Sequence, residues 1–222
     1  MASRWRNVGW SLAACLGLVL GGAMVALSLI DVATGATASG ASSSLVVERR
    51  AMGPRNAKVQ IVVYNDFQCP HCYELHRAAE PEIIERYVRT GLARLEVRQF
   101  AVMGPESVMA AEASLCAADQ GRFWEYRDAL FSAWRQKGYS AYSEAGVRAV
   151  ADQVGLDRDA FGSCLVSGAR LAEVEEDMRR GKAEGITAVP SVFINGRQVV
   201  GTQPFQVYAK IIDEELEKEL AK

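Results

Sequence analysis

The 222-residue sequence has few of the residues that mark several classes of protein. Its five cysteines are too few for a small fold held together mainly by disulfides, and a chain of this length buries a core without them. It has no excess of basic charge, because 25 Lys and Arg face 27 Asp and Glu, for a formal net charge of −2. This balance argues against a nucleic-acid-binding surface. Half of the residues are apolar and 23% are charged, as in a folded globular protein.

A long run without charged residues lies near the N-terminus. Residues 8–30 contain no Asp, Glu, Lys or Arg, and at ~1.5 Å per residue a helix of this length spans about 34 Å, enough for the ~30 Å core of a bilayer. Arg4 and Arg6 precede the run and Asp31 follows it. The positive-inside rule therefore predicts that residues 1–7 stay in the cytoplasm and that the chain after residue 30 is exported.

Two fates of this run remain open. It is either a transmembrane signal anchor, which its length favours, or a signal peptide that is cleaved near Ala38, after the small residues Ala36-Thr37-Ala38. We predict a flexible tether over residues 31–52, because residues 34–44 are almost wholly Gly, Ala, Ser and Thr. The folded domain, residues 53–222, would then lie outside the cytoplasm, attached to the membrane or else periplasmic or secreted, where disulfides persist.

The rest of the chain predicts an α/β fold. Apolar and β-branched runs predict strands over residues 59–64 and 92–102 on either side of a helix that Pro81 should kink. Residues 106–184 show only helical patterns, and they predict a helical insertion. A strand over residues 189–194, an Asn195-Gly196 turn, a second strand and a closing helix over residues 204–220 follow.

The candidate chemistry lies in the motif Cys69-Pro70-His71-Cys72, directly after the first strand. Two cysteines three positions apart at the start of a helix lie on one face, close enough to form a disulfide, and Pro70 suits the first helical position. Free N–H groups and the helix dipole stabilise a thiolate there, so we expect Cys69, assisted by His71, to be the nucleophile. Cys72, one turn further in, is the expected resolving thiol.

This asymmetry predicts the direction of the reaction. A stabilised Cys69 thiolate favours the reduced protein, which makes the Cys69–Cys72 disulfide an oxidant of other thiols. Two alternatives are weaker. A zinc site that uses His71 or His76 lacks a second half-site, and an inert disulfide that closes so short a loop adds little stability. We therefore predict a redox pair with no metal and no organic cofactor.

The segments VQIVVYNDFQCPHC, QGRFWEYRDALF and GITAVPSVFINGRQVVG resemble DsbA-type thiol–disulfide oxidoreductases of the thioredoxin superfamily. The resemblance covers most of residues 52–220. It implies a thioredoxin-like fold with a helical insertion at about residues 106–184. It also implies a protein dithiol–disulfide oxidoreductase that donates its Cys69–Cys72 disulfide to exported proteins.

The resemblance adds expectations at three further places. Val189 and Pro190 should share a cis peptide bond, face the cysteine pair and dock the backbone of the substrate. Cys116 and Cys164 should form a structural disulfide, the alternative being two separate buried thiols. Relatives often carry a buried acid in the first strand, which this chain lacks, and Asp66 either takes over that role or only shapes the turn before the helix.

The implied partners are unfolded exported proteins with free thiols and a membrane re-oxidising protein of the DsbB or VKOR kind. The chain itself would be anchored through residues 8–30. Other functions remain as alternatives, namely a disulfide reductase or isomerase and a membrane-tethered metal-binding chaperone. Replacement of a Gly-Pro pair by Pro70-His71 weakens the reductase interpretation, and the lack of a separate dimerisation domain weakens the isomerase interpretation.

Overall fold

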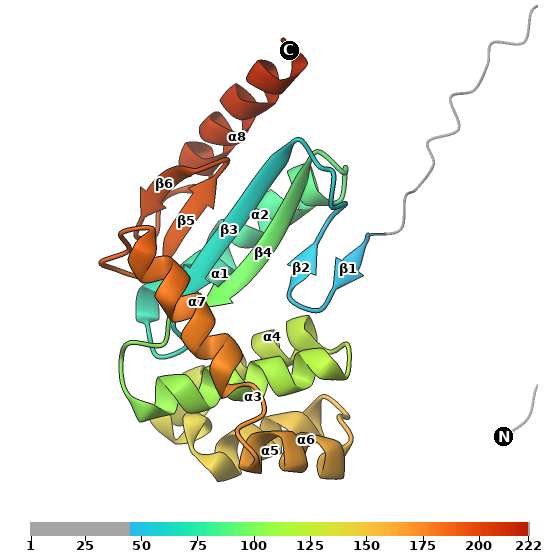
Figure 1. The fold of residues 1–222 in the computed structure, drawn as a ribbon, viewed down its shortest axis with the longest axis vertical. Helices are drawn as coiled ribbons and strands as arrows, with labels where there is room; N and C mark the ends of the chain where they lie inside the picture. The colour runs from blue at the N-terminus through green and yellow to red at the C-terminus, as the bar shows by residue number, and fades with distance from the viewer. Residues whose placement is uncertain (1–44, 222) are drawn as a thin grey trace, which may run out of the picture. The chain divides into compact units, whose positions relative to one another are not determined.

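A computed structural model describes residues 45–221, which form a six-stranded mixed sheet with helices on both faces (Figure 1). The strands are β1 (Val47–Glu48), β2 (Ala51–Met52), β3 (Val59–Asn65), β4 (Ala93–Gln99), β5 (Ser191–Ile194) and β6 (Arg197–Val200). The α-helices are α1 (Pro70–Ala78), α2 (Glu80–Ile83), α3 (Pro105–Asp119), α4 (Phe123–Lys137), α5 (Glu144–Gln153), α6 (Arg158–Val166), α7 (Leu171–Ala183) and α8 (Phe205–Leu220). A π-helix, η1 (Ile84–Val88), and a 3₁₀-helix, η2 (Gly138–Tyr142), complete them.

The predicted segments 1–7 and 8–30, and the possible cleavage site near residue 38, lie outside the described residues. Among the helices of residues 45–221, none combines the length and the apolar character needed to cross a bilayer.

The sheet has the strand order β1-β2-β4-β3-β5-β6. Strands β3 and β4 are parallel, and every other neighbouring pair is antiparallel. The central strand β3 therefore has β4 on one side and β5 on the other, although β4 and β5 are separated by the whole predicted insertion. The Asn195-Gly196 turn joins β5 to β6 with positive φ at both residues, as the hairpin prediction required.

Alternation along the central strands separates the two faces of the sheet. Val59, Ile61 and Val63 of β3 are buried together with apolar side chains of α1, α2, η1 and α8. Tyr64 points to the opposite face, where it lies with Phe100 and Ile186 in a smaller cluster. Figure 1 shows α7 crossing this second face. The strand pattern of period two thus produces a three-layer arrangement.

The structure differs from the prediction at the end of the tether. Residues 31–52 were expected to be irregular, yet Val47–Glu48 and Ala51–Met52 form a hairpin whose second strand pairs with β4. Gly53 then has a φ of +93°, and a Cβ atom there would lie 2.4 Å from the Ala93 carbonyl oxygen. Only glycine permits this close return of the chain to the sheet. The hairpin escaped prediction because two-residue strands carry no periodic pattern.

The helix after the motif is divided into three segments. The sequence predicted a helix to about residue 89 with a kink at Pro81, and the structure has α1, α2 and η1 in succession. Pro81 lies in the first turn of α2, where its missing N–H group leaves no intrahelical bond unmade. The π-turn follows directly, with Arg89 N–H donating to the Ile84 carbonyl at 2.9 Å.

The predicted insertion is present as α3 to α7 together with η2. Its core contains apolar side chains from α3 to α6, and Phe67, Cys69 and Cys72 belong to the same cluster. The cysteine motif is therefore covered by the insertion on one side and supported by the sheet on the other.

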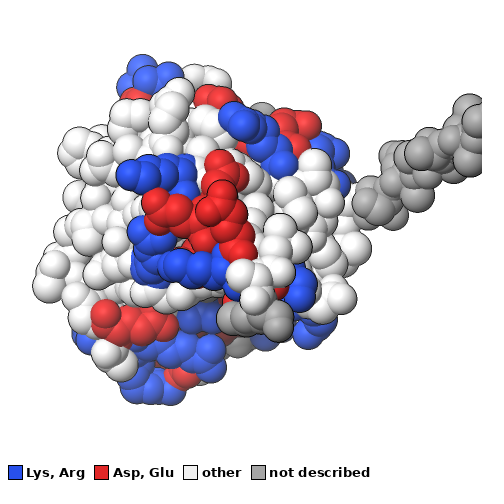
Figure 2. All heavy atoms as spheres, turned by 90° about the horizontal axis from the view of Figure 1, so that it is seen from above, with Lys and Arg blue, Asp and Glu red and all other residues white. Residues whose placement is uncertain are grey.

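Acidic and basic side chains alternate on the face drawn in Figure 2, which shows no broad area of one sign.

Candidate functional site

The cysteine motif occupies the start of α1, where the sequence placed it. Cys69 is the N-cap residue with extended backbone, at φ −80° and ψ 116°, and Pro70 is the first helical residue. Cys72 lies in the first turn. Both cysteines are free thiols. Cys69 is 6% exposed and Cys72 is 1% exposed, so only the first sulfur lies close to solvent.

The pKa values of the two thiols are moved in opposite directions. Hydrogen bonding from the Cys72 thiol is the largest influence on Cys69, followed by the backbone N–H groups of Cys72 and His71 and by the charge of His71. Together they outweigh burial and lower the pKa of Cys69 to about 6. Burial, first of all, and the interaction with Cys69 raise the pKa of Cys72 well above its ordinary value. The sequence predicted that the two pKa values would differ, but it did not predict the main reason for the low pKa of Cys69, which is the hydrogen bond from the Cys72 thiol.

Val189 and Pro190 lie beside the motif. Their peptide bond is cis, as the resemblance implied. The Cys69 thiol donates to the Val189 carbonyl oxygen at 3.4 Å, across 120 positions of sequence. The strand β5, which begins at Ser191, pairs with β3, which ends just before the motif, and this pairing brings the two segments together.

Asp66 holds the turn between β3 and the motif. Its carboxylate is buried and accepts hydrogen bonds from the backbone N–H groups of Gln68, Val102 and Met103 and from the Ser107 hydroxyl. Its own backbone N–H donates to the Cys72 sulfur at 3.4 Å. Four donors on one carboxylate support the turn-forming role that the sequence left as one of two alternatives.

The insertion contacts the motif through aromatic side chains. The Tyr142 hydroxyl of η2 donates to the Phe67 carbonyl at 2.5 Å. The Phe131 ring of α4 lies 5.1 Å from the Phe67 ring, centroid to centroid. Tyr73, one residue after the motif, packs on Phe131 and Trp134. These contacts fix the backbone on which Cys69 is carried.

A buried ion pair next to α1 was not predicted. Glu80 of α2 and Arg127 of α4 form a two-fold hydrogen-bonded pair, with Nη2 to Oε2 at 2.9 Å, and both are at least 97% buried. His76 lies next to them, with its ring stacked on Phe131 at 4.8 Å and its Nε2 3.5 Å from the Asp128 carboxylate. Glu80 and Arg127 are 47 positions apart, so the sequence alone does not distinguish them from charged residues on the surface.

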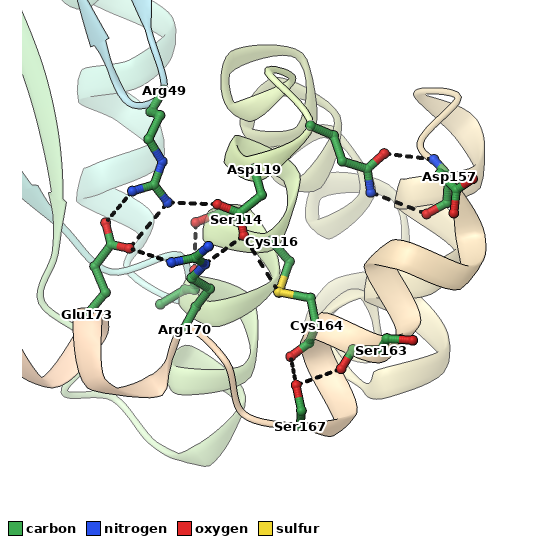
Figure 3. The surroundings of a disulfide bond; sticks show 12 residues. Arg49, Ser114, Cys116, Asp119, Asp157, Ser163, Cys164, Ser167, Arg170 and Glu173 are labelled. Carbon is green, nitrogen blue, oxygen red and sulfur yellow. Dashed lines mark hydrogen bonds and ion pairs between the residues drawn. A yellow bond between two sulfur atoms is a disulfide. The ribbon is translucent and has the colours of Figure 1, made fainter.

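Cys116 of α3 and Cys164 of α6 form the disulfide that the resemblance implied, with an S–S distance of 2.01 Å. It closes a loop of 48 residues, and chain entropy alone makes such a cross-link worth about 4 kcal/mol. Figure 3 shows it next to Asp119, which pairs with Arg49 at 3.0 Å and with Arg170 at 2.6 Å. This cross-link lies within the insertion and does not involve the two cysteines of the motif.

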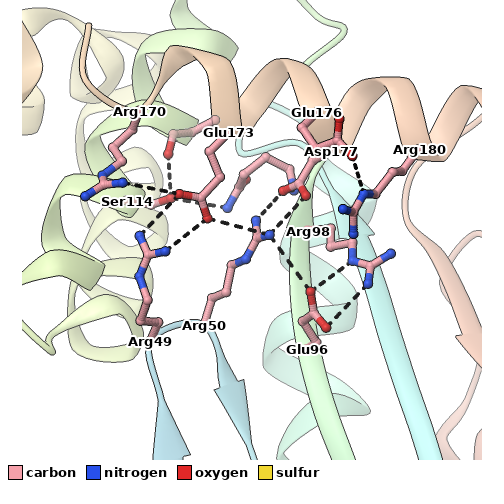
Figure 4. Close-up of polar contacts among 12 residues, drawn as sticks. Arg49, Arg50, Glu96, Arg98, Ser114, Arg170, Glu173, Glu176, Asp177 and Arg180 are labelled. Atoms are coloured by element: carbon pink, nitrogen blue, oxygen red, sulfur yellow. Dashed lines mark hydrogen bonds and ion pairs between the residues drawn. The ribbon is translucent and has the colours of Figure 1, made fainter. Parts of the chain in front are cut away.

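Arginines of the β1–β2 turn bind the hairpin to the insertion and to the sheet (Figure 4). Arg49 contacts Glu173 of α7 at 3.2 Å, and Arg50 pairs with Asp177 of the same helix. Asp177 also accepts from the backbone N–H of Gln99 in β4 at 2.9 Å. Two salt bridges and one hydrogen bond therefore connect the hairpin to α7, and α7 to β4.

Within residues 45–221, no three His, Cys, Asp or Glu side chains gather in a way that could hold a metal ion. His71, one of the two histidines considered for such a site, is exposed at the motif, whereas His76 packs on Phe131.

The reduced protein is expected to titrate at Cys69 with a midpoint near pH 6, measured by ultraviolet thiolate absorbance. Because folding lowers this pKa, the thiolate stabilises the reduced form fully above the pKa of an unfolded cysteine, about 8.5, and loses this effect as the pH falls through about 6. As the pH is lowered from about 8.5 to about 6, the free energy of unfolding of the reduced protein should therefore fall compared with that of the disulfide form. A midpoint near 8.5 would contradict the assignment of Cys69.

Comparisons with known proteins find curated relatives with two kinds of name. The chain is 30% identical over 161 residues to the Na(+)/H(+) antiporter NhaA 3 of Salinispora tropica, covering 71% of this chain and 23% of that protein. It is 25% identical to the probable disulfide bond formation protein D of Bacillus anthracis, covering 77% and 79%. The chain thus spans only about a quarter of the antiporter relatives that it matches.

Two crystal structures have the same fold. Wolbachia pipientis α-DsbA1 superposes with a TM-score of 0.70 at 24% identity, covering 78% of this chain and 92% of that one. Oxidised BdbD of Bacillus subtilis gives 0.67 at 20% identity, covering 76% and 92%. The family model described as thioredoxin matches residues 46–214, which is most of the chain. With its cysteine pair at the start of α1 facing a cis-proline, the chain belongs to the thioredoxin family.

Proposed function

We propose that this protein is a DsbA-type thiol–disulfide oxidoreductase that donates its Cys69–Cys72 disulfide to exported proteins during oxidative folding. The observation that carries the proposal is the unequal pair of thiols. Cys69 has a pKa of about 6 and lies nearest to solvent, whereas Cys72 is buried with a raised pKa. The relative from Bacillus anthracis, whose name refers to disulfide bond formation, supports the same activity.

The reaction follows from the difference between the two sulfurs. A substrate thiolate attacks the Cys69 sulfur, the Cys69–Cys72 bond breaks, and Cys72 leaves and takes up a proton because its pKa is high. The second substrate thiolate then attacks the substrate sulfur of the mixed disulfide and expels Cys69. A thiol of low pKa is a good leaving group, so this step is favoured. The substrate loses two electrons and two protons, of which one proton remains on Cys72 and the other goes to solvent.

Side chains around the motif suit an unfolded polypeptide as substrate. Val102 and Met103, which follow β4 and whose N–H groups bind Asp66, are 51% and 48% exposed. Val200 at the end of β6 is 47% exposed. We expect a substrate backbone to pair as an added strand with Val189, which lies next to Cys69, and exposed apolar groups such as these suit an unfolded chain.

The proposal also includes the compartment and the partners. Residues 8–30 would act as a signal anchor or signal peptide that exports the domain, so that its substrates are exported proteins with free thiols. Turnover then needs an external oxidant of the Cys69–Cys72 dithiol, a membrane protein of the DsbB or VKOR kind.

Equilibration of the purified protein with glutathione redox buffers tests the direction of the reaction. The midpoint potential should be at least about 30 mV above the −270 mV of thioredoxin, because one pKa unit below the thioredoxin thiol, about 7, corresponds to that shift. The Cys116→Ser/Cys164→Ser variant should have the same midpoint, which assigns the couple to the motif. A midpoint at or below −270 mV would instead indicate a disulfide reductase.

A further inference from the structure

The loop between β6 and α8 contacts both the cis-proline segment and the cysteine motif. Its Gly201 backbone N–H donates to the Pro190 carbonyl oxygen at 2.8 Å. The next residue, Thr202, donates from its hydroxyl to the His71 carbonyl oxygen at 2.6 Å, across 131 positions of sequence. One short loop thus bonds to the cis-proline segment and, through a single side chain, to the middle of the cysteine motif.

The bond from Thr202 reaches a peptide group that also contacts the nucleophile. The His71 carbonyl and the Cys72 N–H belong to one planar peptide unit, in which the two groups point in opposite directions. Cys72 lies in the first turn of α1, whose N-cap is Cys69, and its backbone N–H is one of the groups that lower the pKa of Cys69. A hydrogen bond at the carbonyl end polarises the unit and strengthens the N–H at the other end.

Geometry supports the same chain of contacts. A carbonyl oxygen has two lone pairs, so His71 can accept from Thr202 in addition to its place in the helix. Fixing this oxygen fixes the plane of the peptide unit, and with it the direction in which the Cys72 N–H points. The donor is therefore held toward Cys69 before a substrate arrives.

We infer that Thr202 is a positioning residue for the redox pair, whose hydroxyl acts through the His71–Cys72 peptide unit to favour the reduced, thiolate-bearing form over the disulfide. The inference deepens the proposed function and rests on it. The disulfide form carries no charge on Cys69, so the polarised N–H stabilises it less, and the Thr202 bond increases oxidising power. The same loop also donates a hydrogen bond to Pro190, so one loop holds both the cysteine motif and the segment at which we expect substrate to dock.

Thr202→Val tests the inference, because valine has the shape of threonine without its hydroxyl. In the reduced full-length protein, the pKa of Cys69 should rise from about 6, as measured by thiolate absorbance. The equilibrium constant with glutathione should shift toward the disulfide form by up to about tenfold, the upper limit set by one net hydrogen bond. Thr202→Ala should behave in the same way, and Thr202→Ser, which keeps the hydroxyl, should behave like the wild type.

Thr90→Val is the matched control. The Thr90 hydroxyl also donates to backbone carbonyls, at 2.9 Å to Arg86 and 3.0 Å to Tyr87, but it lies after η1, 18 positions beyond Cys72. This variant should leave both measurements unchanged. An unaltered Cys69 pKa in Thr202→Val, or an equal shift in Thr202→Ser, would overturn the inference. The titration needs no substrate, so it separates this result from a failure of the proposed oxidase activity, which the wild-type potential alone decides.

Discussion

Cys69→Ser is expected to abolish disulfide transfer to a reduced, unfolded substrate protein, whereas Cys72→Ser should retain the nucleophile and accumulate mixed disulfides. The reason is the different access of the two sulfurs. Cys69, at the N-cap of α1 beside the Val189 carbonyl, is 6% exposed, whereas Cys72 is 1% exposed. A substrate thiol therefore reaches only Cys69, and without Cys72 the bond to substrate has no internal thiol to release it.

The measurement is non-reducing electrophoresis of proteins captured by each variant, together with the rate of oxidation of a reduced model substrate. Cys116→Ser/Cys164→Ser serves as the control, because it removes the other two described cysteines and leaves the motif intact. It should oxidise substrate at the wild-type rate. Capture of substrate by Cys69→Ser at the level of Cys72→Ser would show that the second sulfur is the nucleophile and contradict the proposed mechanism.

Arg127→Met is expected to lower the free energy of unfolding by about 3–5 kcal/mol, the cost of leaving one charge of a buried pair without its partner. Burial by itself raises the pKa of Glu80, yet Arg127 and His76 hold it at about 2. A carboxyl with a lowered pKa adds stability above its unfolded pKa, about 4.3, and this contribution is lost only as the pH falls toward 2. At neutral pH the whole effect of the pair is present.

Urea unfolding of Arg127→Met and of Arg158→Met compares a buried with an exposed pair. Arg158 pairs with Asp152 at 2.5 Å, but its side chain is 76% exposed, so its replacement should cost no more than about 1 kcal/mol. Glu80→Met/Arg127→Met should recover part of the lost stability, since both charges are then removed. Similar losses in the two single variants would refute the role assigned to the buried pair.

The sequence predicted the parts of the fold that depend on local pattern. The β-branched run at residues 59–64, the helix-spaced apolar residues of the insertion and the Asn195-Gly196 turn all lie in the expected elements. The β1–β2 hairpin was missed, because its strands are held by pairing with β4 and by the arginines of its turn, which a local pattern does not contain.

For the site, the spacing of the motif was sufficient to place Cys69 and Cys72, and the family resemblance correctly implied the cis bond before Pro190 and the Cys116–Cys164 disulfide. Contacts between residues far apart in sequence were not predictable in the same way. Glu80 with Arg127 is one example. Another is Thr202 with His71, where a single hydroxyl in a loop gives no sequence signal until β6 brings it to the motif.

The order of the strands has a consequence for the protein while it is being synthesised. The segment with β3 and both motif cysteines leaves the ribosome early, but β5, which completes the sheet beside it, follows only after residues 100–190 have been made. A nascent or truncated chain that ends before residue 189 therefore carries both motif cysteines without Pro190 and without Val189, whose carbonyl contacts Cys69. Under the proposed function, the segment that docks substrate is therefore among the last parts of the domain to be made.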